Sequence, residues 1–123
     1  MRALQNLVPY AHVESVQRAI DFYEQLGFEA VNTFQPEEAE RPVWAYLVSG
    51  GAQLMLAEAD EPVDPSQQAV LFYLYTDDVV GLHAELGEAG VDVGEISHPF
   101  YMPAGEFRIE DPDGYVSLVA QLS

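Results

Sequence analysis

Few residues of this chain have the types and spacing needed for chemistry, and histidine comes first among them. The sequence holds three histidines and no cysteine, so thiol nucleophiles, disulfides and cysteine metal sites are excluded. His12 lies in an apolar run close to Tyr10 and could act as a base or contact a ligand. A single base without an evident oxyanion partner favours contact over catalysis. His83 is expected on an exposed helix face and His98 in a loop, so the pattern predicts no catalytic residue.

A second candidate is a pair of opposite charges near the C-terminus. Glu106 and Arg108 alternate with Phe107 and Ile109, which places the two charges on one face of a predicted strand. A solvated strand face is the interpretation that this pattern favours. The alternative is a charged pair that reaches a ligand.

The charge balance restricts the partners. Twenty-one acidic residues face four arginines and no lysine, for a formal charge of −17. Nucleic acids and anionic membranes both need a basic face and are therefore excluded. The acidity would be either a solvated surface, as in salt-adapted proteins, or a groove that attracts a cationic ligand. With no signal-like N-terminus and no apolar run of about 18 residues, we expect a cytoplasmic protein.

The elements that must position these residues occur twice. Five residue pairs match at a constant offset of 63 residues without a gap: Tyr10 and Tyr73, Val16 and Val79, Gly27 and Gly90, Pro36 and Pro99, Gly51 and Gly114. Only two copies are present, and the period exceeds that of solenoid repeats. The pattern therefore indicates a duplicated half-domain.

Each copy predicts the same order of elements. In the first copy, strands are expected over 7–13, 28–34, 43–48 and 53–57, with a helix from the N-cap Ser15 to Gly27. In the second, strands are expected over 69–76, 91–96, 106–110 and 115–122, with a helix from the N-cap Asp78 to Gly90. Turns are predicted at Ser49-Gly50-Gly51 and at residues 111–114.

The predicted fold class is α+β, with two tandem βαβββ modules that form curved mixed sheets and carry their helices on the outer side. We expect residues 1–123 to form a single domain of two pseudo-repeats, about 1–59 and 69–123, joined by a linker at about 60–68.

The chain resembles the vicinal oxygen chelate superfamily, which includes glyoxalase I, extradiol dioxygenases and bleomycin resistance proteins. The residues that carry the resemblance are Phe22-Tyr23, Leu26-Gly27-Phe28 and the final Asp111-Pro112-Asp113-Gly114 hairpin. The superfamily hosts unrelated chemistries, so the resemblance implies the fold more than an activity.

The resemblance also implies where a metal would bind. Metal-dependent members take ligands from the first and last strands of each module, and those positions here are Val8, Met55, Leu71 and Leu118. Valine and leucine offer no lone pair, and methionine is a poor ligand for hard or borderline divalent ions. The chain therefore resembles the metal-free bleomycin resistance proteins, and we expect neither metal nor cofactor.

In the family, the concave sheet faces bind the ligand. Strand alternation then predicts an apolar, aromatic binding face suited to an organic molecule. Its candidate residues are Tyr10, His12, Trp44, Tyr46, Met55, Leu71, Tyr73, Tyr75, Tyr101 and Leu118.

Two of these assignments depend on details that the sequence leaves open. Trp44 would lie opposite Met55 and face the ligand if Ser49-Gly50 formed a two-residue turn, whereas a slip of one residue would turn it into the helix-side core. The loop triplet Phe100-Tyr101-Met102 would be a groove wall or dimer contact, or it would pack over the sheet edge.

The sequence thus predicts a homodimeric, metal-free protein that binds a small organic molecule in a groove partly built at the dimer interface. Its most specific form is sequestration of a cationic or aromatic antibiotic of the bleomycin class. The alternatives are a metal-dependent lyase or oxygenase with displaced ligands that include His12, and a dimeric interaction domain with no small ligand.

Overall fold

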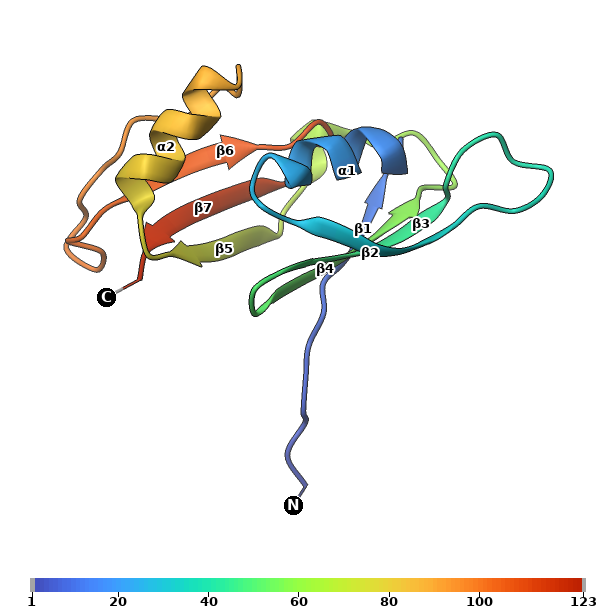
Figure 1. The fold of residues 1–123 in the computed structure, drawn as a ribbon, viewed down its shortest axis with the longest axis horizontal. Coiled ribbons are helices and arrows are strands. Elements are labelled where there is room, and N and C mark those ends of the chain that lie inside the picture. Colours follow the sequence, from blue (N-terminus) through green and yellow to red (C-terminus); the bar gives the residue numbers. More distant parts are fainter. Residues whose placement is uncertain (1, 123) are drawn as a thin grey trace. The chain divides into compact units, whose positions relative to one another are not determined.

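The computed structural model describes residues 2–122, which form two compact units. The first unit ends at Val63 and the second begins at Asp64. Each unit pairs its first and last strands in parallel and covers one sheet face with one helix (Figure 1). No helix in this part of the chain is long and apolar enough to cross a bilayer. The predicted α+β class is confirmed, with one mixed sheet of four strands and one of three.

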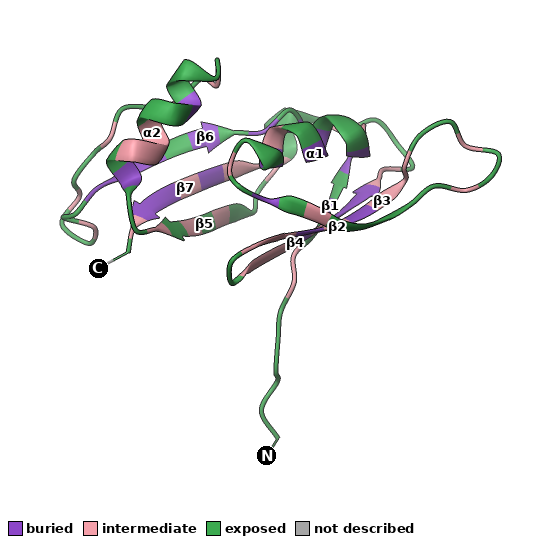
Figure 2. Ribbon diagram, viewed as in Figure 1, coloured by how far each residue is buried: buried purple, intermediate pink, exposed green. Residues whose placement is uncertain are grey.

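The first unit has the predicted βαβββ order. Its elements are β1 (Tyr10–Val13), α1 (Val16–Glu24), β2 (Glu29–Phe34), β3 (Trp44–Ser49) and β4 (Ala52–Glu58). The sheet order is β1-β4-β3-β2, and all pairs except β1–β4 are antiparallel. The core lies between α1 and the sheet, where every second strand residue is buried (Figure 2). Its strand side consists of Ala11, Val13, Ala45, Leu47, Leu54 and Leu56.

The second unit departs from the prediction in one element. It contains β5 (Leu71–Thr76), α2 (Val79–Glu88), β6 (Glu106–Glu110) and β7 (Val116–Gln121), in the sheet order β5-β7-β6. A short 3-10 helix, η1 (Pro65–Gln67), precedes them. The strand predicted over 91–96 is not formed, so the second copy lacks the strand equivalent to β2.

The segment 91–96 instead lies along β6 through scattered contacts. Gly94 donates its N–H to the Arg108 carbonyl at 3.0 Å, and Ser97 exchanges two backbone hydrogen bonds with Glu106. His83 of α2 is half-buried rather than exposed, because its ring bonds the Gly94 carbonyl at 2.8 Å. A Cβ at Gly94 would lie only 3.2 Å from the Arg108 carbonyl oxygen. The backbone at Gly94 therefore lies close to β6 without forming a regular hydrogen-bond ladder with it. For this reason the β pattern of the sequence did not lead to a strand here.

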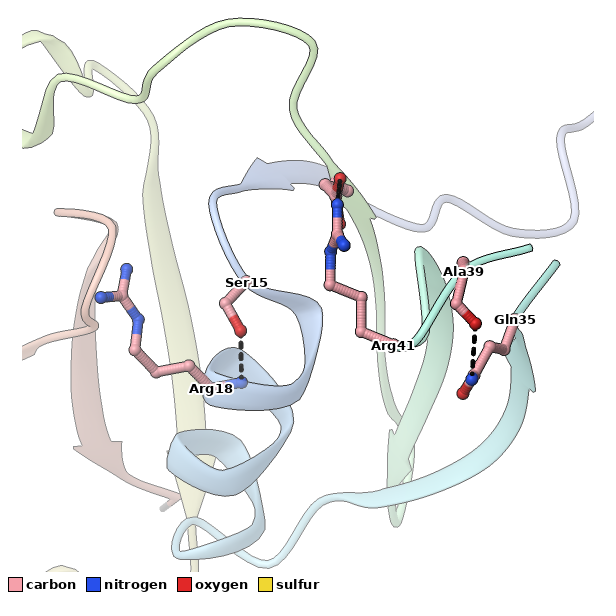
Figure 3. Close-up of polar contacts among 6 residues, drawn as sticks. Ser15, Arg18, Gln35, Ala39 and Arg41 are labelled. Carbon is pink, nitrogen blue, oxygen red and sulfur yellow. Dashed lines mark hydrogen bonds and ion pairs between the residues drawn. The ribbon is translucent and has the colours of Figure 1, made fainter. Parts of the chain in front are cut away.

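Both helices begin and end as the sequence predicted. The Ser15 hydroxyl accepts the Arg18 N–H at 3.1 Å, as Figure 3 shows, and the Asp78 carboxylate accepts the Gly81 N–H at 2.9 Å. Gly27 and Gly90 follow the two helices with the same left-handed φ of 89°. Each cap satisfies backbone groups that would otherwise lack partners.

The loop between β2 and β3 is bonded to the end of β4. Arg41 pairs with Glu58 through two hydrogen bonds of 2.8 Å, and Gln35 donates to the Ala39 carbonyl at 3.0 Å (Figure 3). The hydrogen bond from Arg41 holds the pKa of Glu58 below its usual range. Glu58 is the last residue of β4, so this ion pair joins the loop to the sheet.

The repeat-equivalent glycines Gly51 and Gly114 meet different surroundings. Gly51 lies in an open turn, where an added Cβ would have no neighbour within 4 Å. Gly114 has a left-handed φ of 88° and is buried under η1, where a Cβ would lie 2.5 Å from the Pro65 backbone. Its turn is fixed by Asp111, whose carboxylate accepts the N–H groups of Asp113 and Tyr115.

Gly114→Ala should therefore destabilise the protein by about 2 kcal/mol or more, because the side chain is strained at this φ and collides with backbone. Gly51→Ala is the matched control and should change stability by no more than about 0.5 kcal/mol. The free energy of unfolding in urea measures both. Equal effects of the two substitutions would contradict the packing described for Gly114.

Candidate ligand-binding site

The sheet face of the first unit that α1 does not cover carries most of the predicted ligand residues. Strand register aligns them in two rows across the sheet. Tyr10, Met55 and Tyr46 lie opposite one another in the first row, and His12, Ala57 and Trp44 in the second. The rows place three aromatic side chains, a histidine and a methionine on one face.

Trp44 reaches this face through a different turn from the one considered in the sequence. The two-residue turn is Gly50-Gly51, so Ser49 pairs with Ala52 and Trp44 lies opposite Ala57 rather than Met55. The register differs by two residues from the Ser49-Gly50 alternative. An even shift preserves the face, because side chains alternate with a period of two. Trp44 and Tyr46 therefore share the face of Met55.

The rings of this face form edge-to-face pairs. Tyr10 and His12 have ring centroids 5.3 Å apart, and those of Trp44 and Tyr46 are 6.5 Å apart. Tyr10 and His12 are exposed, whereas Trp44 and Tyr46 are half-buried. The Tyr46 hydroxyl donates to the Gln53 side chain, which was not predicted as a site residue. The result is an aromatic surface with polar tips, of the kind that binds flat organic molecules.

The uncovered face of the second unit carries the remaining predicted residues. From β5 come Leu71, Tyr73 and Tyr75, which are 57%, 39% and 59% exposed. Tyr73 pairs with Leu118 of β7, and the Tyr73 and Tyr75 rings are stacked with centroids 5.5 Å apart. All five predicted residues in this unit lie on or beside this face, with Tyr101 contributed by the loop before β6.

Glu106 is a functional candidate that the sequence analysis considered but did not favour. It was expected on a solvated strand face, yet it is only 5% exposed. Its carboxylate accepts a hydrogen bond from the Tyr73 hydroxyl and a longer one, of 3.4 Å, from Tyr101. Arg108 does remain exposed and bonds Glu110 at 3.3 Å. The strict alternation of 106–110 places Glu106 opposite the core face correctly, but it gives no sign that Tyr73 and Tyr101 bond its carboxylate.

The contact with Glu106 also perturbs Tyr73. The hydrogen bond to the carboxylate raises the pKa of Tyr73 to about 12, with burial and the negative charge of Glu106 acting in the same direction. Tyr73 therefore stays a neutral hydrogen-bond donor well above physiological pH.

The members of the triplet Phe100-Tyr101-Met102, in the loop before β6, differ in their surroundings. Phe100 is 95% exposed and Tyr101 is 59% exposed, whereas Met102 is half-buried. Tyr101 reaches the sheet face through its bond to Glu106. The loop thus contributes one ring to this face and leaves another free to contact a partner.

The structure places the four residues at which the resemblance implied metal ligands on or next to strands. Met55, Leu71 and Leu118 lie in β4, β5 and β7, and Val8 precedes β1. Within residues 2–122, no group of three or more histidine, aspartate or glutamate side chains is placed to hold a metal ion.

Comparison with known families identifies the fold. A family model described as the Glyoxalase/Bleomycin resistance protein/Dioxygenase superfamily matches residues 9–117, so the chain belongs to that superfamily. The resemblance found in the sequence is thereby confirmed. No curated protein sequence matches this chain significantly.

Solved structures give the same result over nearly the whole chain. A bleomycin-binding protein in complex with bleomycin is 19% identical, with 98% of this chain and 100% of that one covered at a TM-score of 0.77. A bleomycin resistance determinant encoded on transposon Tn5 is 19% identical, with 96% and 98% covered at a TM-score of 0.76. TnmS3, an antibiotic-binding protein from Streptomyces sp. CB03234, is 26% identical, with both chains fully covered at a TM-score of 0.75.

Glu106→Gln should lower the pKa of Tyr73 from about 12 towards 10, because it removes the negative acceptor. In the native protein, the stabilisation from this contact is fully present below pH 10 and is lost as the pH rises through 12. Tyrosinate absorbance measured against pH, with Tyr73→Phe to identify the transition, tests this. Glu110→Gln is the control and should leave the titration unchanged.

Proposed function

We propose that this protein binds a small organic molecule on its uncovered sheet faces, without metal and without chemical conversion. The observation that carries the proposal is that equivalent strands of both units present exposed tyrosines, while the metal positions of the superfamily are apolar. Aromatic faces provide stacking and apolar contact, which suit binding.

The relatives support an antibiotic as the ligand. The structures of similar fold include a protein bound to bleomycin and an antibiotic-binding protein. In its most specific form, the proposal is that this chain sequesters a cationic or aromatic antibiotic in the cytoplasm. The formal charge of −17 supports a cation, because it attracts one at long range.

A homodimer is part of the same proposal. The uncovered faces are open surfaces, and a second copy would add walls that bury more of a ligand. Exposed apolar residues such as Leu7, Phe34 and Val70 supply candidate contact surface. Sedimentation of the protein with and without ligand would test this assembly.

Trp44 provides a direct reporter of binding, because it is the only tryptophan of the chain and lies on the first unit's uncovered face. We expect bleomycin-class and flat aromatic compounds to change its fluorescence saturably. Tyr10→Ala should weaken the best ligand about tenfold, the loss expected for one stacked ring. Val80→Ala, on the exposed side of α2, is the control and should leave the affinity unchanged.

Thermal and chemical stability provide the second arm of this test. A ligand at about 100 times its dissociation constant should add about 2.7 kcal/mol to the free energy of unfolding. If no compound of a broad panel changes either the Trp44 signal or the stability, the binding proposal fails and the chain is better described as an interaction domain.

Incubation of the purified protein with Mn²⁺, Fe²⁺, Ni²⁺ and Zn²⁺ tests the metal-dependent alternative. We expect no stoichiometric metal after desalting and an unchanged melting temperature. About one retained ion per chain with a raised melting temperature would overturn the metal-free proposal. His12→Ala would then show whether His12 is a displaced ligand, because it should release the ion.

A further inference from the structure

The buried carboxylate of Glu106 lacks the partner that such a charge normally has. Glu106 is 5% exposed, and among the described residues only Tyr73 and Tyr101 donate hydrogen bonds to its side-chain oxygens. Within residues 2–122 no arginine or histidine forms an ion pair with it. Arg108 is two residues along the same strand, but its guanidinium bonds Glu110 instead. Two donors satisfy part of the hydrogen-bonding capacity of the carboxylate and leave its charge uncompensated.

The surface over this charge is built from aromatic rings. Tyr73 and Tyr75 are stacked and exposed, and the Tyr101 ring comes from the preceding loop. Tyr75 and Glu106 lie in the same cross-strand row, on either side of Ala120. The alanine side chain is small, so little protein lies between the tyrosine ring and the carboxylate. Ring faces attract cations, and an anion behind them increases that attraction because the intervening medium is poorly screening.

The hydrogen bonds to Glu106 restrict the kind of cation. Each carboxylate oxygen already accepts one tyrosine hydroxyl, and little of the carboxylate reaches solvent. A guanidinium or primary ammonium requires direct acceptors for its N–H groups. A quaternary ammonium has no N–H group, and its methyl groups contact ring faces while its charge interacts at a distance. The arrangement therefore favours a permanently charged, alkylated nitrogen.

We propose that the uncovered face of the second unit is a binding site for a quaternary ammonium group, formed by Tyr73, Tyr75 and Tyr101 over the buried carboxylate of Glu106. The inference rests on the proposed function and adds the charge and chemical class of the ligand group. It differs from long-range attraction by the acidic surface, because a buried charge acts locally and is little affected by salt.

Phenyltrimethylammonium and 2-phenyl-2-propanol are suitable probes, since they have nearly the same shape and only the first is charged. Titration followed by ligand proton NMR gives both dissociation constants. We expect phenyltrimethylammonium to bind at least about tenfold more tightly, with its methyl signal shifted upfield by the tyrosine rings. This preference should persist at about 0.5 M salt, where exposed charges are largely screened.

Glu106→Gln should abolish most of the preference, weakening the charged probe about tenfold and leaving the neutral probe within about twofold. The neutral probe also reports whether the face remains folded in the variant. Glu110→Gln is the matched control, since it removes one charge from the same strand at an exposed position. Tyr75→Leu, which retains the carboxylate and removes one ring, should weaken the charged probe about fivefold.

The outcomes separate this inference from the proposed function. Equal effects of Glu106→Gln and Glu110→Gln, or loss of the preference in salt, would assign the attraction to net charge and overturn the site. If phenyltrimethylammonium fails to bind while a neutral aromatic compound still changes Trp44 fluorescence, the onium site is wrong and the binding function stands. If neither binds, both are wrong.

Discussion

The parallel pairing of the first and last strand in each unit is the constraint on which the rest of the structure depends. A parallel pair needs a crossover, and in both units the crossover contains the helix, which covers one sheet face. Side chains alternate across the sheet, so one set packs under the helix and the other is left on the opposite face. The apolar core and the aromatic surface are therefore two consequences of one arrangement. The proposed ligand-binding faces are therefore built mainly from strand residues, with Tyr101 of the loop before β6 added in the second unit.

The two faces nevertheless differ in character, and a register shift of one residue explains the difference. On β5 and β7, Tyr73, Leu118 and Ala120 occupy the places of Tyr10, Met55 and Ala57. On β6 the constant repeat offset would put Phe107 in the place of Trp44. The observed pairing puts Glu106 there, opposite Ala120, and turns Phe107 into the core. Where the first unit has the aromatic pair Trp44 and Tyr46, the second therefore has the charged pair Glu106 and Arg108. The face of the first unit therefore combines aromatic rings with a histidine and a methionine, whereas that of the second unit contains the carboxylate of Glu106.

The same shift marks the limit of what the sequence could predict. Helix caps, helix ends and the strands of the parallel pairs depend on local residue chemistry, and these predictions agree with the structure. The register between hairpin strands is not a local property, since it depends on which residues form the turn and on which sheet face packs against the helix. The burial of Glu106 follows from register, so it could not be read from the alternation at 106–110. The prediction of a strand at 91–96 was wrong for a related reason, because the residue pattern gives no information on the close approach of Gly94 to β6.

The burial of Glu106 also changes the interpretation of the acidity of the whole chain. Most of the acidic residues are exposed, and exposed charges contribute a field that salt screens over about 10 Å. Such a field accelerates the approach of any cation but does not distinguish one from another. Selectivity requires a charge held away from water and surrounded by groups of defined shape. Glu106, with Tyr73 bonded to it and Tyr75 stacked on Tyr73, meets that requirement, whereas the exposed loop acids do not. If the proposed function holds, the net charge of −17 would act in recruitment and the buried carboxylate of Glu106 in recognition.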